Sequence, residues 1–182
     1  VGKSVAQIAE AEKLTTVELV ERIARTGGAS IVNFSMSEDD VRHVMQVPWV
    51  ATASDGRAYL PGPDRPHPRS YGTFARKLGH YAVREKVLPL QAAIRSMTGL
   101  PASILGLGDR GTIKVGHFAD VAVFDPETIR DAATFKEPHQ YSEGFRYVFV
   151  NGRPAVFKGQ STGALAGRAL IHARPEPRKK SR

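Results

Sequence analysis

The apolar positions in the first part of the chain follow two kinds of spacing. Residues 4–14 and 16–26 repeat apolar side chains at helical intervals, which predicts two amphipathic helices. Short apolar runs at 30–34 and 49–53 are typical of buried strands. A helix is expected between them, after Ser37, whose hydroxyl suits an N-cap. Strand, capped helix and strand in this order predict a βαβ arrangement of the α/β class.

A proline-rich loop and further helices follow the second apolar run. The loop spans residues 56–70, and fixed proline φ angles make it stiff, which suits holding polar side chains in set positions. Its prolines are Pro61, Pro63, Pro66 and Pro68. Helical spacing then returns at 71–86 and 90–98, and a short third helix is expected at 101–107.

The pattern changes to β structure near residue 108. Residues 119–125 alternate between apolar and other side chains, which predicts a strand, and residues 146–159 predict a hairpin that turns at Asn151-Gly152. We therefore expect one domain portion at 1–107, a β domain portion at 108–173, and a basic tail at 174–182.

Composition and charge narrow the class of protein. The net charge is +8, and the tail, which is expected to be disordered, carries a net +4 of it. The remaining charge requires no nucleic-acid partner. The chain has no cysteine, so it contains no disulfide and no thiolate ligand or nucleophile. No apolar run is long enough to span a membrane, and we expect a cytoplasmic protein.

The candidate chemistry starts at Asp55, which directly follows the apolar run at 49–53. A carboxylate at the end of a barrel strand can bind a divalent cation or transfer a proton at a reacting centre. Ser-Asp-Gly is also a favourable turn sequence, and on the residues alone that interpretation is the better supported one. The six histidines are His43, His67, His80, His117, His139 and His172. None forms a His-x-His or His-x-x-x-His pair, so the chain by itself offers no complete zinc site.

Arg69 and Tyr71 lie at the exit of the loop that also carries His67. A guanidinium there suits bidentate binding of a substrate carboxylate. A surface arginine paired with a neighbouring acid explains Arg69 equally well, so spacing alone leaves both possibilities open.

Several stretches together resemble the C-terminal part of the N-acyl-D-amino-acid deacylases (D-aminoacylases) of the amidohydrolase superfamily. They are residues 54–56, 67–81, 93–126 and 133–156. The stretch HPRSYGTF, at the start of residues 67–81, is the most family-specific, whereas the pattern at 111–125 is shared across the superfamily. The resemblance implies the last strands and helices of a metal-dependent (β/α)₈ TIM barrel, followed by C-terminal strands of a small β-sandwich domain.

The resemblance also implies roles for individual residues. Asp55 would be the last-strand aspartate, which binds zinc, deprotonates the attacking water and then protonates the leaving amine. Arg69 would bind the substrate's α-carboxylate, with His67 and Tyr71 in the same substrate-binding region. The other expected zinc ligands, a His-x-His pair and a cysteine, are absent from this sequence. We therefore expect the final third of an enzyme, inactive alone and completed by an N-terminal portion or a complementary subunit.

Two other functions are compatible with these residues. The chain could belong to a cyclic-amide hydrolase of the same superfamily, like dihydroorotase or hydantoinase. It could also be a non-catalytic subunit or assembly module whose basic tail contacts acidic partners.

Overall fold

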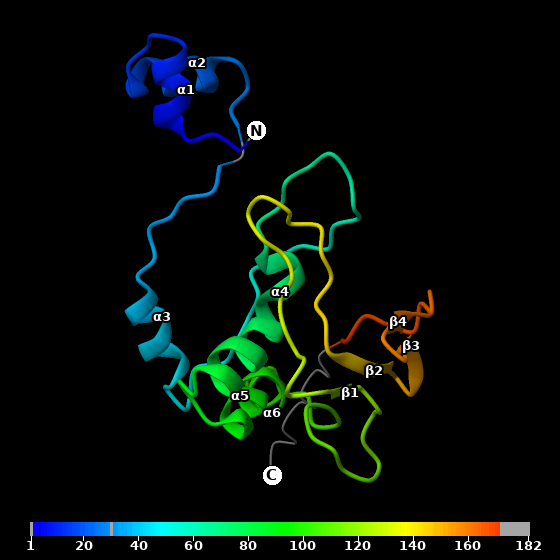
Figure 1. The fold of residues 1–182 in the computed structure, drawn as a ribbon. Helices are drawn as coiled ribbons and strands as arrows, with labels where there is room; N and C mark the ends of the chain where they lie inside the picture. Colours follow the sequence, from blue (N-terminus) through cyan, green and yellow to red (C-terminus); the bar gives the residue numbers. More distant parts are fainter. Residues whose placement is uncertain (1, 30, 172–182) are drawn as a thin grey trace, which may run out of the picture. The chain divides into compact units, whose positions relative to one another are not determined.

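The computed structural model describes residues 2–29 and 31–171, which form two compact units, Val1–Met36 and Ser37–Arg182 (Figure 1). The predicted tail at 174–182 and His172 lie outside the described residues. The domain boundary predicted between residues 107 and 108 stays a prediction. Among the described residues, every helix is too short or too polar to span a lipid bilayer.

The first unit is a helical pair whose two helices begin at sequence-encoded caps. Helix α1 (Val5–Ala11) starts after Ser4 and α2 (Thr16–Arg25) after Thr15, and both starts form capping boxes. The two predicted helices are therefore confirmed. Of the apolar face of α2, Leu19 is buried, whereas Val17 and Val20 stay exposed.

The second unit begins with helices that surround one apolar core. Helix α3 (Glu38–Met45) starts at Ser37 as predicted, and its acidic first turn suits the positive end of the helix dipole. The predicted helix at 71–86 begins earlier: α4 (Arg69–Arg76) continues directly into a π-helix, η1 (Lys77–Arg84). Helices α5 (Leu90–Met97) and α6 (Gly99–Ile104) follow.

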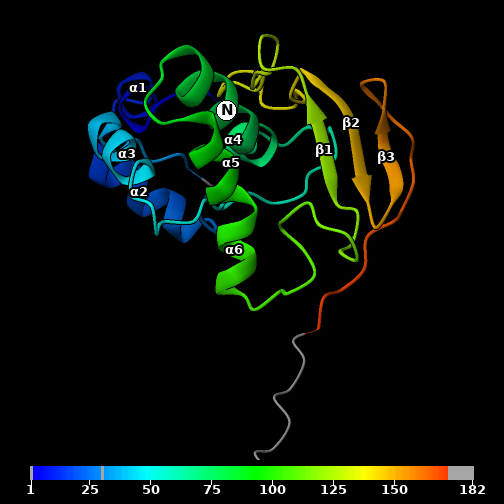
Figure 2. The same ribbon diagram turned by 90° about the horizontal axis from the view of Figure 1, so that it is seen from below.

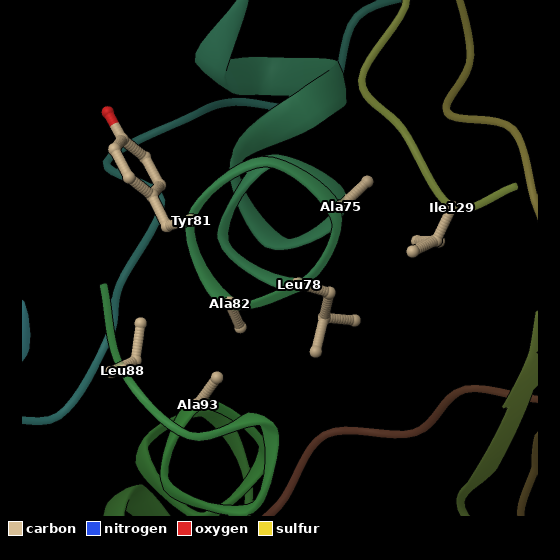
Figure 3. Packing of buried hydrophobic residues seen from close by; sticks show 7 residues of the cluster. All are labelled: Ala75, Leu78, Tyr81, Ala82, Leu88, Ala93 and Ile129. Atoms are coloured by element: carbon tan, nitrogen blue, oxygen red, sulfur yellow. The ribbon is translucent and has the colours of Figure 1, made fainter. Parts of the chain in front are cut away.

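The core joins this helical run to a segment from the β part of the chain. Leu78, Ala75 and Ala93 are buried together with Ile129, which faces Leu78 and Ala75 (Figure 3). The approach is close because Gly79 has no side chain: a Cβ there would lie 2.0 Å from the Ile129 carbonyl oxygen. The π-helix is thus fixed against Ile129.

The β part is a four-stranded antiparallel sheet in the order β1-β2-β3-β4. Figure 2 shows β1, β2 and β3 side by side. The strands are Val121–Phe124, Phe145–Val150, Arg153–Phe157 and Gln160–Ser161. Asn151 and Gly152 both have positive φ, 50° and 78°, as a type I′ turn requires. The predicted hairpin is confirmed.

The two strands predicted at 30–34 and 49–53 are not strands in this structure. The described residues 31–34 and 49–53 form no β-ladder. A strand is held by backbone hydrogen bonds to a neighbouring strand, and these residues pair with none of the described strands. A short apolar run thus did not by itself indicate a strand here, because a strand also needs a pairing partner.

Candidate active site

Asp55 lies in a short turn that packs against the start of α4. Its φ is +49°, a left-handed conformation that aspartate tolerates better than most residues. The Gly56 amide donates to Ser54 Oγ at 3.1 Å, and a Cβ on Gly56 would lie 2.8 Å from Ser70 Cα. Only glycine therefore allows this approach, which aims the Asp55 turn at the first residues of α4.

The predicted residues Asp55 and Arg69 meet in an ion pair. Arg69 Nη2 lies 2.9 Å from Asp55 Oδ2, and the aspartate side chain is 84% exposed. The structural interpretation of each residue therefore describes a real feature: Asp55 is a turn residue, and Arg69 has an acidic neighbour. The loop thus brings a carboxylate and a guanidinium that are 14 positions apart into contact at the protein surface.

His67 belongs to the same cluster and has a defined hydrogen-bonding role. The Arg69 amide donates to His67 Nδ1 at 3.1 Å, so the neutral ring carries its proton on Nε2. Burial, reinforced by the Arg69 cation and opposed by Asp55, lowers the pKa of His67. The ring of Phe135 contacts His67 edge-on at a centroid distance of 5.0 Å. His67 is therefore a neutral N–H donor beside Arg69.

This lowered pKa predicts a pH dependence of stability. In the unfolded chain His67 has its ordinary pKa of 6.5, whereas in the folded chain its pKa is lower. The unfolded chain therefore binds the proton more readily, and acidification below pH 6.5 favours unfolding. We expect urea unfolding to show a steeper loss of stability between neutral pH and pH about 5 for the wild type than for His67→Gln. Parallel pH profiles of the two proteins would show that His67 is not in this environment.

The segment before Asp55 is held by hydrogen bonds to two buried polar residues, Lys77 and Ser96. The Thr52 amide donates to the Ser96 carbonyl at 2.8 Å, and Thr52 Oγ1 accepts from Lys77 Nζ at 2.7 Å. Lys77 is only 6% exposed, and burial lowers its pKa. No local pattern predicts this network, because its members are up to 44 residues apart.

Tyr71, the fourth predicted residue, forms its side-chain hydrogen bonds with residues other than Asp55 and Arg69. Its hydroxyl lies 3.1 Å from the Tyr59 carbonyl oxygen and 2.8 Å from His139 Nδ1. Sequence reasoning assigned no role to His139. Its stretch was part of a family motif, but nothing in the spacing connected it to the loop.

The described residues contain no group of three or more His, Cys, Asp or Glu that could hold a metal ion. Asp55 nevertheless fits one position of a zinc site, because its carboxylate is exposed and oxygen donors of this kind bind zinc. A complete site therefore requires ligands that these residues do not supply.

A comparison with known families identifies the class of protein. The chain belongs to the amidohydrolase family, whose sequence pattern matches residues 3–156. It is 39% identical over 93% of its length to a D-aminoacylase of Alcaligenes xylosoxydans xylosoxydans. The predicted resemblance to the N-acyl-D-amino-acid deacylases is confirmed. The chain spans only about a third of that relative, 34% of its length.

Solved structures agree with this assignment. A D-aminoacylase with a binuclear metal centre matches 94% of this chain with a TM-score of 0.84 and 37% identity, over 35% of its own length. N-acyl-D-glutamate deacylase of Bordetella bronchiseptica, solved with zinc and a phosphonate mimic of the tetrahedral intermediate, matches 91% with a TM-score of 0.77 and 36% identity, again over 35% of its length.

Proposed function

We propose that this chain supplies part of the active site of a zinc-dependent deacylase, which hydrolyses N-acyl-D-amino acids to a D-amino acid and a carboxylate. The observation that carries the proposal is the 2.9 Å contact between Asp55 and Arg69. It brings an acid and an anion-binding cation to one point within a chain that resembles such deacylases over more than nine-tenths of its length. The same long matches favour deacylation over cyclic-amide hydrolysis.

The proposed active protein contains this chain and the remaining two-thirds of the relatives' length, whether covalently joined or as a separate subunit. We call this the complete enzyme. In it, residues 30–34 and 49–53 would pair as the last strands of a (β/α)₈ barrel within the portion 1–107. The portion 108–173 would complete a small β-sandwich. Exposed Ile31 and Trp49, at 73% and 75%, support this, since large apolar side chains on a predicted strand need covering neighbours.

In the complete enzyme, Asp55 would contribute one carboxylate oxygen to the metal. Zinc bound there would polarise the amide carbonyl and lower the pKa of a water molecule. Asp55 would accept the proton from the attacking water and deliver it to the leaving amine. Its exposed side chain, held by the turn at Gly56, leaves room for both tasks.

Arg69 and His67 would bind the substrate's α-carboxylate. The guanidinium offers paired N–H donors in the geometry that a carboxylate fits, and the neutral His67 ring adds an Nε2–H donor beside it. Because Arg69 reaches Asp55, a substrate held by its carboxylate would place its neighbouring amide close to the acid.

The test of this role is Arg69→Ala in the complete enzyme. We expect KM for an N-acyl-D-amino acid to rise by about tenfold to about a hundredfold, because a charged hydrogen bond to the carboxylate is lost. Arg69→Lys should recover only part of the affinity, since lysine lacks the paired donors. An equal loss for the matching N-acyl amine, which has no carboxylate, would show that Arg69 acts otherwise.

A further inference from the structure

The proline-rich loop at residues 56–70 is held by a distant segment of the β part. We define the brace as residues 134–141, and Figure 1 shows it beside the loop that precedes α4. Arg65 donates to the Lys136 carbonyl, and His139 Nε2 lies 2.7 Å from the Asp64 carbonyl oxygen. The partners are more than 70 residues apart in sequence. The stiff loop is therefore not free-standing.

The proton positions in the brace follow from the partners. A carbonyl oxygen can only accept, so His139 Nε2 must carry a hydrogen to bond to Asp64. A neutral His139 then presents Nδ1 as an acceptor to the Tyr71 hydroxyl at 2.8 Å. Burial raises the pKa of Tyr71, so this hydroxyl keeps its single proton.

That single proton has two possible acceptors, His139 Nδ1 and the Tyr59 carbonyl. If His139 is an imidazolium, Nδ1–H donates to the Tyr71 oxygen and the Tyr71 proton goes to Tyr59, so all three hydrogen bonds form together. If His139 is neutral, Tyr71 shares its proton between the two acceptors. In both states Asp64 is bound, and only the neutral Nδ1–H tautomer is excluded.

We propose that His139 and Tyr71 are positioning residues: together they hold the loop by the main-chain carbonyls of Tyr59 and Asp64, and so place His67 and Arg69 for substrate binding. The first half of this proposal concerns the chain alone. The second half rests on the proposed deacylase function. In this proposal Tyr71 acts on the loop through its hydroxyl, whose two contacts are the Tyr59 carbonyl and His139 Nδ1.

The test on the chain itself uses nuclear magnetic resonance. Long-range ¹H–¹⁵N correlation should show His139 with a proton on Nε2, and a neutral ring protonated on Nδ1 would overturn the proposal. His139→Ala and Tyr71→Phe should both lower the heteronuclear NOE of the Tyr59, Leu60 and Asp64 amides. His43→Ala, which changes an exposed histidine of α3, is the matched control and should leave these amides unchanged. Equal loop order in all variants would also overturn the proposal.

The test in the complete enzyme separates positioning from structural damage. His139→Ala should raise KM about tenfold and change kcat by less than about twofold, because it loosens a substrate-binding loop without touching the reacting atoms. His139→Gln should recover part of this loss, since its side-chain amide can still donate to Asp64. An unchanged KM in His139→Ala would refute the proposed role. If the complete enzyme hydrolyses no N-acyl-D-amino acid, the proposed function fails, while the resonance test still decides the brace.

Discussion

Asp55→Asn is expected to lower kcat of the complete enzyme by about 10³-fold or more, because one side chain both binds the metal and transfers the proton. Asparagine keeps the size and the turn of Asp55 but has neither the charge nor the basicity. The measurement is the initial rate of D-amino acid release at saturating substrate and zinc. The loss should persist across pH, since no pH restores a base that is absent.

Glu127→Gln is the matched control for this variant. It also removes one negative charge, but Glu127 is exposed and lies in the β part after β1. Its rate should equal that of the wild type. If Asp55→Asn retained more than about a tenth of the wild-type kcat, Asp55 would not be the general acid–base of this reaction.

Gly79→Ala is expected to have the largest effect on stability. The added Cβ would lie 2.0 Å from the Ile129 carbonyl oxygen and 2.9 Å from Arg84 Nη2. The same carbonyl accepts from Arg84 Nη1 at 3.0 Å, so the clash also displaces a hydrogen bond of the core. We expect the free energy of unfolding to fall by about 3 kcal/mol or more, because neither the π-helix nor residue 129 can withdraw without opening the buried cluster.

Urea unfolding followed by circular dichroism measures this loss. Gly108→Ala is the control, since no heavy atom lies within 4 Å of the Cβ that it would add, and its midpoint should stay close to that of the wild type. A Gly79→Ala midpoint equal to that of Gly108→Ala would mean that the contact between η1 and Ile129 is not this close.

Local signals predicted those elements whose partners are near in sequence. Ser37 and the acidic turn after it determine the start of α3, and Asn151-Gly152 determines the hairpin, since both act within a few residues. The start of α4 was less visible. Its N-cap residue, Pro68, makes no side-chain capping hydrogen bond, so no local signal marks the start of the helix. The helix includes Arg69, which the sequence pattern places in the loop.

Long-range partners explain what the sequence could not predict. The runs at 30–34 and 49–53 have strand-like composition, but a strand also needs a pairing partner, and the described residues 31–34 and 49–53 pair with no strand. Likewise, Asp55 and Arg69 were both candidates, yet their contact depends on the fold of the loop between them. The bond between Tyr71 and His139 joins residues 68 positions apart, and no motif in either stretch indicates it.

The central claim is that Asp55 and Arg69 belong to a zinc-dependent deacylase of N-acyl-D-amino acids. The most direct measurement is hydrolysis of an N-acetyl-D-amino acid and of its L-enantiomer by the complete enzyme, before chelation, after it and after zinc is restored. We predict release of the D-amino acid and acetate in equal amounts, little reaction of the L-enantiomer, loss of activity on chelation and recovery with zinc. Hydrolysis that survives chelation, or cleavage of cyclic amides only, would contradict the claim.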